Sequence, residues 1–530
     1  MRRWNGWGDE TIDFPLAENA YRFLVERIGD GSPLPDATLD DVLAQVPESR
    51  LPDHPLVTKV PEERVRHARG QSLPDWLAVR SGNLGVFPDG VAYPVASEDV
   101  RALLAYGREA GAIIIPYGGG TSVVGHITPE KAEGPVLTID MGRMNRLLSL
   151  DKESQIATFD AGAAGPDVEA QLRAQGYTLG HFPQSFEFST LGGWIATRSS
   201  GQQSLRYGRI EKLFAGGRVE TPAGTLQIPS FPASAAGPDL REMILGSEGR
   251  LGVLTEIKVR VTELPERERF HVVFFPGWQQ AMNAVRRAIQ GKIPLSMLRL
   301  SSAAETQTQL ALAGHERLVA WLEKLLAWRG AGAEKCMLMF GISGTRTQYR
   351  TALKQALRVF RGGTGFHIGK YLGRKWVENR FRAPYLRNSL WEKGYAVDTL
   401  ETATDWQNVD HMVDAIEGAL GSVLTCERKR IHIFTHLSHI YSQGASIYTT
   451  YLFRVGKTHQ ETFALWERLK TAASQAIIEN HGTISHQHGI GLDHAPYLVA
   501  EKGELGIAAI KTLCRQFDPD GMMNPGKLVR

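Results

Sequence analysis

A short glycine-rich segment constrains the fold of this chain more than any other part of its sequence. The apolar run Ala112-Ile113-Ile114-Ile115 is typical of a buried strand, and it leads into Pro116-Tyr117-Gly118-Gly119-Gly120-Thr121-Ser122. Three residues without a Cβ let backbone N–H groups turn toward a bound anion, and two hydroxyl groups follow them. The segment has neither the Rossmann G-x-G-x-x-G pattern nor the lysine of a P-loop. It predicts a pyrophosphate site of another kind; taken alone, it is equally compatible with a plain glycine-rich turn.

Two further segments favour a dinucleotide site. The second is Pro183-Gln184-Ser185-Phe186-Glu187-Phe188-Ser189-Thr190, followed by Gly192 and Gly193. The third is Gly246-Ser247-Glu248-Gly249-Arg250-Leu251-Gly252. Three such segments in this order make an isolated turn the weaker interpretation, because independent signals agree. We expect all three to contact a cofactor, together with Ala196, Thr197, Arg198 and Ser199.

Composition is that of an ordinary soluble globular protein of two or more domains, with 530 residues, 42% hydrophobic and 22% charged. The net charge of +3, without a dense Lys/Arg block, argues against a nucleic-acid binder but suits an anionic substrate. Cys336, Cys426 and Cys514 are widely spaced, so neither a disulfide framework nor a metal site is predicted. We expect a cytoplasmic location, because the sequence shows no signal-peptide core and no apolar run approaching 18 residues.

Changes in residue pattern predict four segments: a helical lead-in at 1–83, a cofactor domain at 84–263, a cap or substrate domain at 264–490, and a C-terminal return at 491–530. Helical spacing is expected at 17–28, 38–45, 97–110, 163–174 and 278–289, and strands at 91–94, 136–140, 156–160 and 271–275. The charged and aromatic region 361–408 is interpreted as a mobile or lid-like insertion.

The three glycine-containing segments resemble the FAD site of the vanillyl-alcohol-oxidase flavoproteins, also called the PCMH type. This resemblance implies an α+β fold: a two-lobed PCMH-type FAD-binding domain, plus an α+β cap domain of the FAD-linked oxidase C-terminal type. Relatives that attach flavin covalently at the first segment use a histidine where this chain has Thr121. The resemblance therefore implies FAD, bound without a covalent link there.

Other motifs resemble the alkyldihydroxyacetonephosphate synthase family more closely. They are Arg3-Trp4-Asn5-Gly6-Trp7-Gly8, Pro384-Tyr385-Leu386-Arg387, Leu400-Glu401-Thr402-Ala403-Thr404-Asp405-Trp406, Gln443-Gly444-Ala445-Ser446-Ile447-Tyr448 and the tail near Asn524. In that family a flavin N5 adduct is implied to let a fatty alcohol replace the fatty acid of acyl-dihydroxyacetone phosphate, giving an ether lipid. By position, Tyr448 matches the family's acid/base tyrosine, and Arg299 and Arg387 match its substrate-site arginines. Without the resemblance, these would be read as a buried strand tyrosine and structural ion-pair arginines.

The clearest departure from the family lies in Ser485-His486-Gln487-His488-Gly489. The family has three consecutive histidines here, whereas this chain has glutamine in the middle. His486 and His488 keep the outer positions and, on a strand, would point to one face. Gln487 can form a hydrogen bond but cannot take up a proton. The alternative is a structural role, in which the two histidines only cap a loop.

Two other functions remain open from the sequence. One is an FAD-dependent dehydrogenase or oxidase of an anionic 2-hydroxy acid, although the His-x-Gly-Asp-Gly-Asn-x-His element of such enzymes is missing at 439–446. The other is a flavin-fold binding module without turnover, against which the three glycine-containing segments argue. The expected partner is a small anionic or lipid-like molecule and not a nucleic acid. Peripheral membrane contact and a homodimer are left open.

Overall fold

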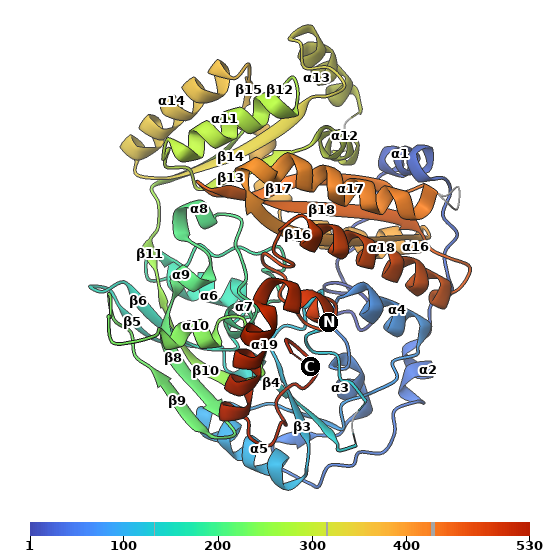
Figure 1. Cartoon of the computed structure of the whole chain (residues 1–530), viewed down its shortest axis with the longest axis vertical. Helices are drawn as coiled ribbons and strands as arrows, with labels where there is room; N and C mark the ends of the chain where they lie inside the picture. The colour runs from blue at the N-terminus through green and yellow to red at the C-terminus, as the bar shows by residue number, and fades with distance from the viewer. Residues whose placement is uncertain (132, 314–315, 426–429, 530) are drawn as a thin grey trace.

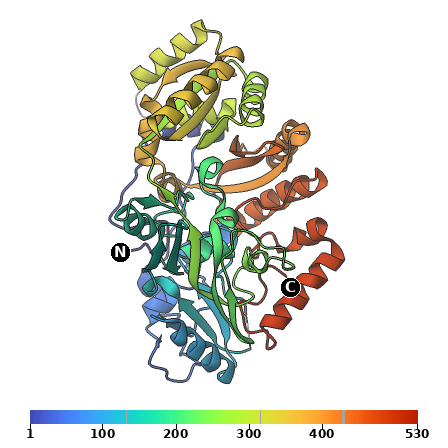
Figure 2. The ribbon, with the colours of Figure 1, turned by 90° about the vertical axis from the view of Figure 1, so that its left-hand side faces the viewer.

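Residues 1–131, 133–313, 316–425 and 430–529 are described by the computed structural model. They form two lobes, one above the other (Figure 1, Figure 2). We call the lobe that contains the first two sheets (residues 57–260) the basal lobe, and the lobe built on the third sheet (residues 267–454) the cap lobe. The expected α+β architecture is confirmed.

The first sheet of the basal lobe carries the first glycine-rich segment. Its strand order is β1 (Val57–Thr58), β2 (Gly90–Ala92), β4 (Val136–Asp140) and β3 (Ile113–Tyr117), and β2, β4 and β3 are parallel. Helix α5 (Ser97–Glu109) packs on it through Val100, Leu103 and Leu104, which lie on one helical face and join a core with Leu137 and Ile139. The glycines follow β3, at the carboxyl edge of the parallel strands.

The second basal sheet is antiparallel. Its order is β5 (Leu147–Asp151), β6 (Ile156–Asp160), β10 (Val253–Arg260), β8 (Phe214–Thr221) and β9 (Gly224–Ile228). Its apolar face packs on α6 (Gly165–Arg173), α7 (Leu191–Ala196) and α9 (Ile210–Leu213). A small pair, β7 (Tyr177–Thr178) and β11 (Thr262–Glu263), lies just before the cap lobe. Three short helices complete this part of the chain: α8 (Ser204–Tyr207), α10 (Leu240–Ile244) and the 3-10 turn η1 (Met141–Arg143).

The cap lobe is built on one seven-stranded antiparallel sheet. Its order is β15 (Phe366–Gly369), β12 (Arg267–Phe275), β14 (Cys336–Gly344), β13 (Met297–Ser301), β17 (His432–Ile440), β18 (Gly444–Arg454) and β16 (Tyr395–Asp405). Four helices cover one face: α11 (Trp278–Gln290), α14 (Arg346–Gly362), α17 (Val409–Thr425) and α18 (His459–Glu479) (Figure 1). On the other face lie α12 (Ala303–Leu312), α13 (Glu316–Trp328) and α15 (Tyr371–Asn379).

Alternation along the central strands determines which side chains face the helices and which face the basal lobe. Leu298, Leu300, Leu437 and Ile447 belong to the core beneath the four helices. Their neighbours Arg299, His436 and Tyr448 line a cavity on the opposite face. This follows from the two-residue period of a strand.

The region 361–408 is not an inserted lid, and that interpretation is wrong. It supplies both edge strands of the cap sheet, β15 and β16, and β16 pairs with β18 from Tyr395 to Asp405. Helix α16 (Leu386–Glu392) connects into β16. Charged and aromatic residues accumulate here because edge strands and short helices have one solvent-facing side.

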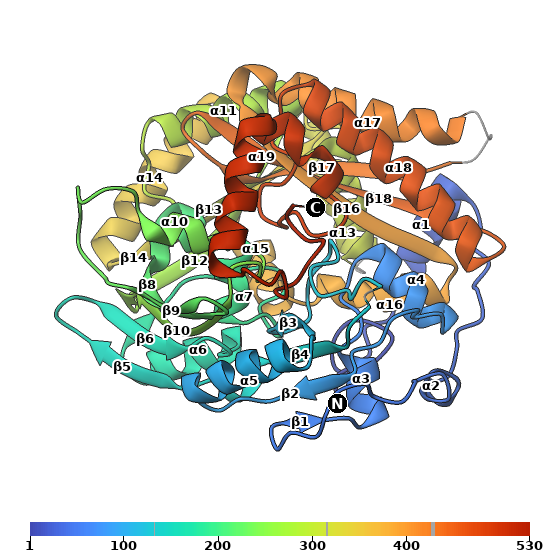
Figure 3. The same cartoon turned by 60° about the horizontal axis from the view of Figure 1, so that its bottom comes forward.

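Both ends of the chain connect the lobes. The helices of the lead-in are α1 (Glu18–Ile28), α2 (Leu39–Leu43), α3 (Pro61–Arg66) and α4 (Leu73–Ser81), as the sequence predicted for this part. The backbone of Trp7 is hydrogen-bonded to the cap lobe. The side chain of Asn388 accepts from its amide at 3.1 Å and donates to its carbonyl at 3.0 Å. At the other end, α19 (Leu498–Phe517) packs on the basal core through Leu498 and Cys514 (Figure 3). The tail then pairs with β3, since Met523 bridges Ile114.

In the described residues, Cys336 and Cys514 are free and buried; Cys426 lies outside them. No helix in these residues is long and apolar enough to cross a membrane.

Candidate functional site

The first glycine-rich segment is packed so closely against the second that side chains are excluded. A Cβ on Gly119 would lie 1.8 Å from the carbonyl oxygen of Phe188, and one on Gly118 would lie 2.3 Å from Oγ1 of Thr190. Gly120 has φ +56°, a left-handed conformation that favours glycine. The backbone of this segment is therefore exposed along a cavity, as close approach of a pyrophosphate requires.

The third segment is connected to the C-terminal part of the chain by Glu248. Its buried carboxylate accepts the amide protons of Ile490 at 2.5 Å and Gly491 at 2.9 Å, and lies 3.0 Å from Nε2 of His126. Asn524 of the tail donates to the carbonyls of His126 and Glu248, at 3.0 and 2.7 Å. The tail thus holds the first and third segments together.

One cavity of about 860 Å³ runs from these segments to the cap sheet. Its basal wall contains all three segments, and its cap wall contains Arg299, His436 and Tyr448. A glycine cradle at one end and titratable side chains at the other fit a bound dinucleotide whose ring meets a substrate under the cap. The residues present therefore fit FAD.

Most of the predicted cofactor residues line this cavity, and their contact with FAD stays a prediction. Those that line it are Pro116, Tyr117, Gly118, Gly119, Gly120, Thr121, Ser122, Pro183, Gln184, Ser185, Ser189, Thr190, Gly192, Gly193, Ala196, Thr197, Ser199, Ser247, Glu248, Gly249, Leu251 and Gly252. Those that the structure places outside the lining are Phe186, Glu187, Phe188, Arg198, Gly246 and Arg250.

These six have other structural contacts. The ring of Phe186 stacks on Phe381, and that of Phe188 packs edge-on against Trp7. Glu187 lies 3.8 Å from the guanidinium of Arg382.

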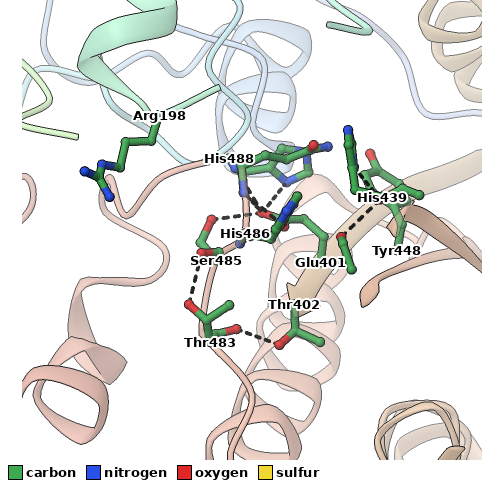
Figure 4. A network of polar contacts seen from close by, with 12 residues as sticks. Arg198, Glu401, Thr402, His439, Tyr448, Thr483, Ser485, His486 and His488 are labelled. Atoms are coloured by element: carbon green, nitrogen blue, oxygen red, sulfur yellow. Dashed lines mark hydrogen bonds and ion pairs between the residues drawn. The ribbon is translucent and has the colours of Figure 1, made fainter. Parts of the chain in front are cut away.

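The other three hold the polypeptide around the third segment. Arg198 pairs with Glu242, and its side chain packs against Gly246. Arg250 donates to the carbonyl of Met523 at 2.6 Å. Figure 4 shows Arg198 set apart from the polar cluster beneath the cap.

The centre of that cluster is the buried carboxylate of Glu401 on β16 (Figure 4). It accepts the amide protons of His486 at 2.7 Å, Gln487 at 3.0 Å and His488 at 2.9 Å, and the hydroxyl proton of Ser485 at 2.9 Å. The segment is therefore a turn wrapped around a carboxylate and not a strand, which corrects the expectation that both histidines point to one face.

The turn separates its three side chains. Gln487 and His488 line the cavity, whereas His486 does not. Nε2 of His486 is hydrogen-bonded to the hydroxyl of Tyr441 at 2.6 Å, and burial lowers its pKa well below the usual value. His486 is thus neutral and lies outside the cavity lining, and its predicted catalytic role stays a prediction. Oε1 of Gln487 is buried and has no hydrogen-bond partner among the described residues.

Tyr448 lies at the cap end of the cavity between two imidazoles. The ring of His436 stacks on it at 5.0 Å between centroids, and that of His488 meets it edge-on at 5.6 Å. Its hydroxyl donates to Oγ1 of Thr399 at 3.2 Å. Burial raises the pKa of Tyr448 to about 12, so the phenol is protonated at neutral pH.

The two predicted substrate arginines both line the cavity but are held differently. Arg299 donates to Oε1 of Glu305 at 2.6 Å. Arg387 donates to the carbonyl of Gln71 at 2.6 Å and lies over the ring of Trp76 at 4.2 Å. Burial lowers the pKa of Arg387 to about 10, which still leaves it cationic at pH 7. The ion-pair interpretation therefore applies to Arg299, whereas Arg387 has no ion-pair partner within 4 Å among the described residues and brings its charge to the cavity.

Sequence reasoning missed Glu305 and His436. Both line the cavity, and Oε2 of Glu305 lies 3.0 Å from Nδ1 of His436. They belong to different elements, α12 and β17, and 131 positions separate 305 from 436 in the sequence. The alternation of 432–440 could have placed His436 on the cavity face, but no local signal joins it to Glu305.

Comparison with known proteins agrees with this geometry. The family model of the FAD binding domain matches residues 88–228, and that of the C-terminal domain of FAD linked oxidases matches residues 264–528. The chain is similar to alkyldihydroxyacetonephosphate synthase of Trypanosoma brucei brucei (29% identical, covering 99% of this chain and 92% of the relative). It is also similar to that of Dictyostelium discoideum (32% identical, 88% and 77%).

A solved structure of alkyldihydroxyacetonephosphate synthase superimposes with a TM-score of 0.85 at 27% identity, covering 99% of both chains. The similarity thus includes the lead-in, the cofactor segments, the cap and the tail. FAD is the cofactor that these domains bind. The chain belongs to the alkyldihydroxyacetonephosphate synthase family of FAD-dependent enzymes.

Proposed function

We propose that this protein exchanges the fatty acid of acyl-dihydroxyacetone phosphate for a fatty alcohol, which yields an ether lipid. The observation that carries the proposal is that one cavity combines a polar end with a long apolar wall. The apolar wall is made by Leu16, Phe23 and Leu24 of the lead-in, Leu310 and Leu312 of α12, and Leu390 and Leu452 of the cap. An alkyl chain would bury its surface there at roughly 0.8 kcal/mol per methylene group.

The polar end supplies the groups that the head of such a substrate needs. Arg387 and Arg299 provide guanidinium groups, which bind a phosphate by two-pronged hydrogen bonds. Tyr448, protonated at neutral pH, provides a hydrogen-bond donor beside them. FAD, when bound along the glycine segments, supplies a flavin ring whose chemistry permits an exchange without net oxidation. The tail and the turn around Glu401 contribute Asn524, Gln487 and His488 to the lining of the site.

A second function is favoured by Gln487. A glutamine cannot carry the charge of the histidine that the family has at this position, and Glu305 already balances the charge of Arg299. Both features suit a weaker anion, such as the carboxylate of a 2-hydroxy acid, with FAD as the hydride acceptor. A small hydroxy acid, however, would not contact the apolar wall, so this function does not account for it.

Purified protein loaded with FAD distinguishes the two functions. The synthase function predicts that labelled long-chain alcohol enters product when acyl-dihydroxyacetone phosphate is supplied, with no external electron acceptor. The dehydrogenase function predicts bleaching of the flavin by a hydroxy acid and no incorporation of alcohol. Incorporation that requires an electron acceptor would contradict the synthase proposal.

The lipid-like substrate suggests that the cap lobe contacts a lipid surface near α13. Leu312 lines the cavity at the end of α12, and α13 exposes Leu318, Trp321 and Trp328, the last two at 62% and 76%. Helix α13 lies at the top of the cap lobe in Figure 1. Exposed tryptophans are typical of the interface between a membrane and water. We propose that these side chains insert into the headgroup region, so that an alkyl chain can pass from the bilayer into the cavity.

Flotation with vesicles of phosphatidylethanolamine and phosphatidylglycerol tests this contact. Trp321→Ser with Trp328→Ser should abolish co-flotation, whereas Leu505→Ser, at a leucine on α19 that is 84% exposed, should not. Equal loss in both variants would contradict the assignment to α13.

We further propose a cytoplasmic location. Cys336 and Cys514 are free thiols, and a reducing compartment keeps thiols in this state.

A further inference from the structure

A carboxylate–imidazole pair lies in the cavity and has no part in the family assignment. Glu305 is 2% exposed and His436 is 7% exposed. Oε2 of Glu305 lies 3.0 Å from Nδ1 of His436, while Oε1 accepts from Arg299 at 2.6 Å and from Gln309 at 2.8 Å. The carboxylate is thus fixed on three sides, and one of its oxygens is directed at the imidazole.

Two groups meet Nδ1 of His436, and the closer one favours a proton there: Oε2 of Glu305 lies at 3.0 Å, whereas the guanidinium of Arg299, which can only donate, lies at 3.4 Å. A carboxylate beside Nδ1 holds the proton there, so the lone pair of a neutral imidazole is on Nε2. Within the described part of the chain the hydrogen-bond contact of the ring, from Arg299, is to Nδ1 and none reaches Nε2, and His436 lines the cavity. The unshared lone pair is therefore available to a molecule in the cavity.

The position of His436 on the sheet places it beside the predicted acid/base tyrosine. His436 of β17 and Tyr448 of β18 are directly opposite in the antiparallel register. Their rings stack at 5.0 Å with an interplanar angle of 22°. A substrate bound beside the ring of Tyr448 in the cavity would therefore also lie close to His436.

We propose that His436 is the general base of the active site, that Glu305 is its positioning residue, and that Tyr448 acts beside it as a hydrogen-bond donor. The proposal rests on the function proposed above. The proton on the carbon next to the substrate ketone passes to Nε2 of His436. The C–H bond breaks, its electron pair remains on the substrate in conjugation with the carbonyl, and an N–H bond forms. The imidazolium is stabilised through Nδ1–H by Glu305, and the same proton returns later, so no oxidant is required.

The protonation states of the two side chains agree with these roles. Burial and the charge of Arg299 lower the pKa of His436 against the opposing effect of Glu305, so the imidazole is neutral at pH 7. The charged and titratable groups facing it are Glu305 on α12, Arg299 on β13, Tyr448 on β18 and His439 on its own strand. The phenol of Tyr448, with its pKa raised to about 12, is a poor base at the same pH.

The test compares His436→Ala with His432→Gln in protein loaded with FAD. His432 is also buried on β17, but it is hydrogen-bonded to Thr308 and does not line the cavity. We expect His436→Ala to lower the turnover number by about 10²–10⁴-fold at normal flavin content, with a much smaller effect on KM. Imidazole added to the buffer should restore part of the rate. His432→Gln should keep the parent rate and show no response to imidazole.

Glu305→Gln provides a second variant should His436→Ala fold poorly. Glu305 raises the pKa of His436, so its neutralisation should lower that pKa further. A base works when deprotonated, so the acidic limb of kcat/KM should move to lower pH while the maximal rate falls.

The parent is assayed first for alcohol exchange, because absence of exchange contradicts the proposed function by itself. The variant-to-parent ratio is taken on alcohol exchange or, where the parent shows none, on flavin reduction by a hydroxy acid, in which the same base would remove the hydroxyl proton. A His436→Ala variant that keeps more than a third of the parent rate would overturn the proposal. Loss without imidazole rescue, together with an unmoved pH limb in Glu305→Gln, would overturn it as well.

Discussion

Glu401 accepts the amide proton of His488 at 2.9 Å, although 87 positions separate the two residues in the sequence. The same carboxylate binds the amides of His486 and Gln487, so a single buried charge on β16 shapes a turn at the start of the C-terminal part. The conformation of residues 486–488 is therefore set by their hydrogen bonds to Glu401 and not by strand pairing.

Glu401→Gln should destabilise the protein and abolish turnover. The side chain of glutamine is neutral and has only one acceptor oxygen, so it binds the three backbone amides more weakly than the carboxylate does. Each charge-assisted hydrogen bond is worth about 1.5–3 kcal/mol. We expect a lower thermal midpoint and a loss of activity larger than the loss of FAD. The matched control is Glu504→Gln at an exposed position of α19. An unchanged midpoint and rate in Glu401→Gln would refute the role of this carboxylate.

Gly119→Ala should prevent retention of FAD. The new Cβ would lie 1.8 Å from the carbonyl oxygen of Phe188, so the first and second segments must separate. The purified variant should be colourless, and its ratio of flavin to protein absorbance should be near zero. Gly418→Ala, on α17 with no atom within 4 Å of its Cβ, should remain yellow. A yellow Gly119→Ala protein would show that the cradle tolerates a side chain.

Tyr448→Phe should reduce turnover by about 10²–10⁴-fold while FAD content stays near normal. The substitution removes only the hydroxyl that donates to Thr399, and the stacked ring remains. Because burial raises the pKa of Tyr448 to about 12, its ionisation should cause no alkaline loss of the parent rate below about pH 10. Retention of more than a third of the activity would remove this hydroxyl from the reaction.

Arg387→Lys should weaken binding of the anionic substrate by tenfold or more in KM. Lysine keeps the charge but cannot both donate to the carbonyl of Gln71 and stack flat on Trp76. Arg143→Lys, at an arginine that lies over Tyr93 away from the cavity, is the control and should bind normally. If Arg387→Lys and Arg387→Ala both bind like the parent, the anion site lies elsewhere.

Gln487→His should maintain or raise alcohol exchange. The side chain lines the cavity and its Oε1 has no partner among the described residues, so an imidazole can be placed there while the backbone stays bound to Glu401. Gln475→His on the exposed face of α18 should have no effect. Impaired flavin reduction by a hydroxy acid in Gln487→His, without any exchange in the parent, would favour the dehydrogenase function.

Local patterns in the sequence predicted the parts of this structure that depend on local interactions. The glycines at 118–120 indicated a cofactor segment because residues without a Cβ let the backbone approach an anion closely, and the helices at 97–110 and 278–289 were evident from their spacing. The region 361–408 was misinterpreted, because its strands pair with partners elsewhere in the chain.

The site depends on pairs that the sequence separates widely. Glu401 with 486–488, and Glu305 with His436, meet only when the cap sheet has formed. Arg250 lies within the third glycine-containing segment and Arg198 follows the second, but both point to structural partners, because proximity in sequence does not set the direction of a side chain.

The central claim is that the protein joins a fatty alcohol to a dihydroxyacetone phosphate unit without net oxidation. Its most direct test is incubation of the purified FAD-loaded protein with acyl-dihydroxyacetone phosphate and radiolabelled long-chain alcohol, under anaerobic conditions and without an electron acceptor. We predict label in an alkali-stable ether lipid, release of one fatty acid per ether formed, and oxidised flavin at the end. Absence of label, together with stoichiometric reduction of the flavin by a hydroxy acid, would contradict the claim.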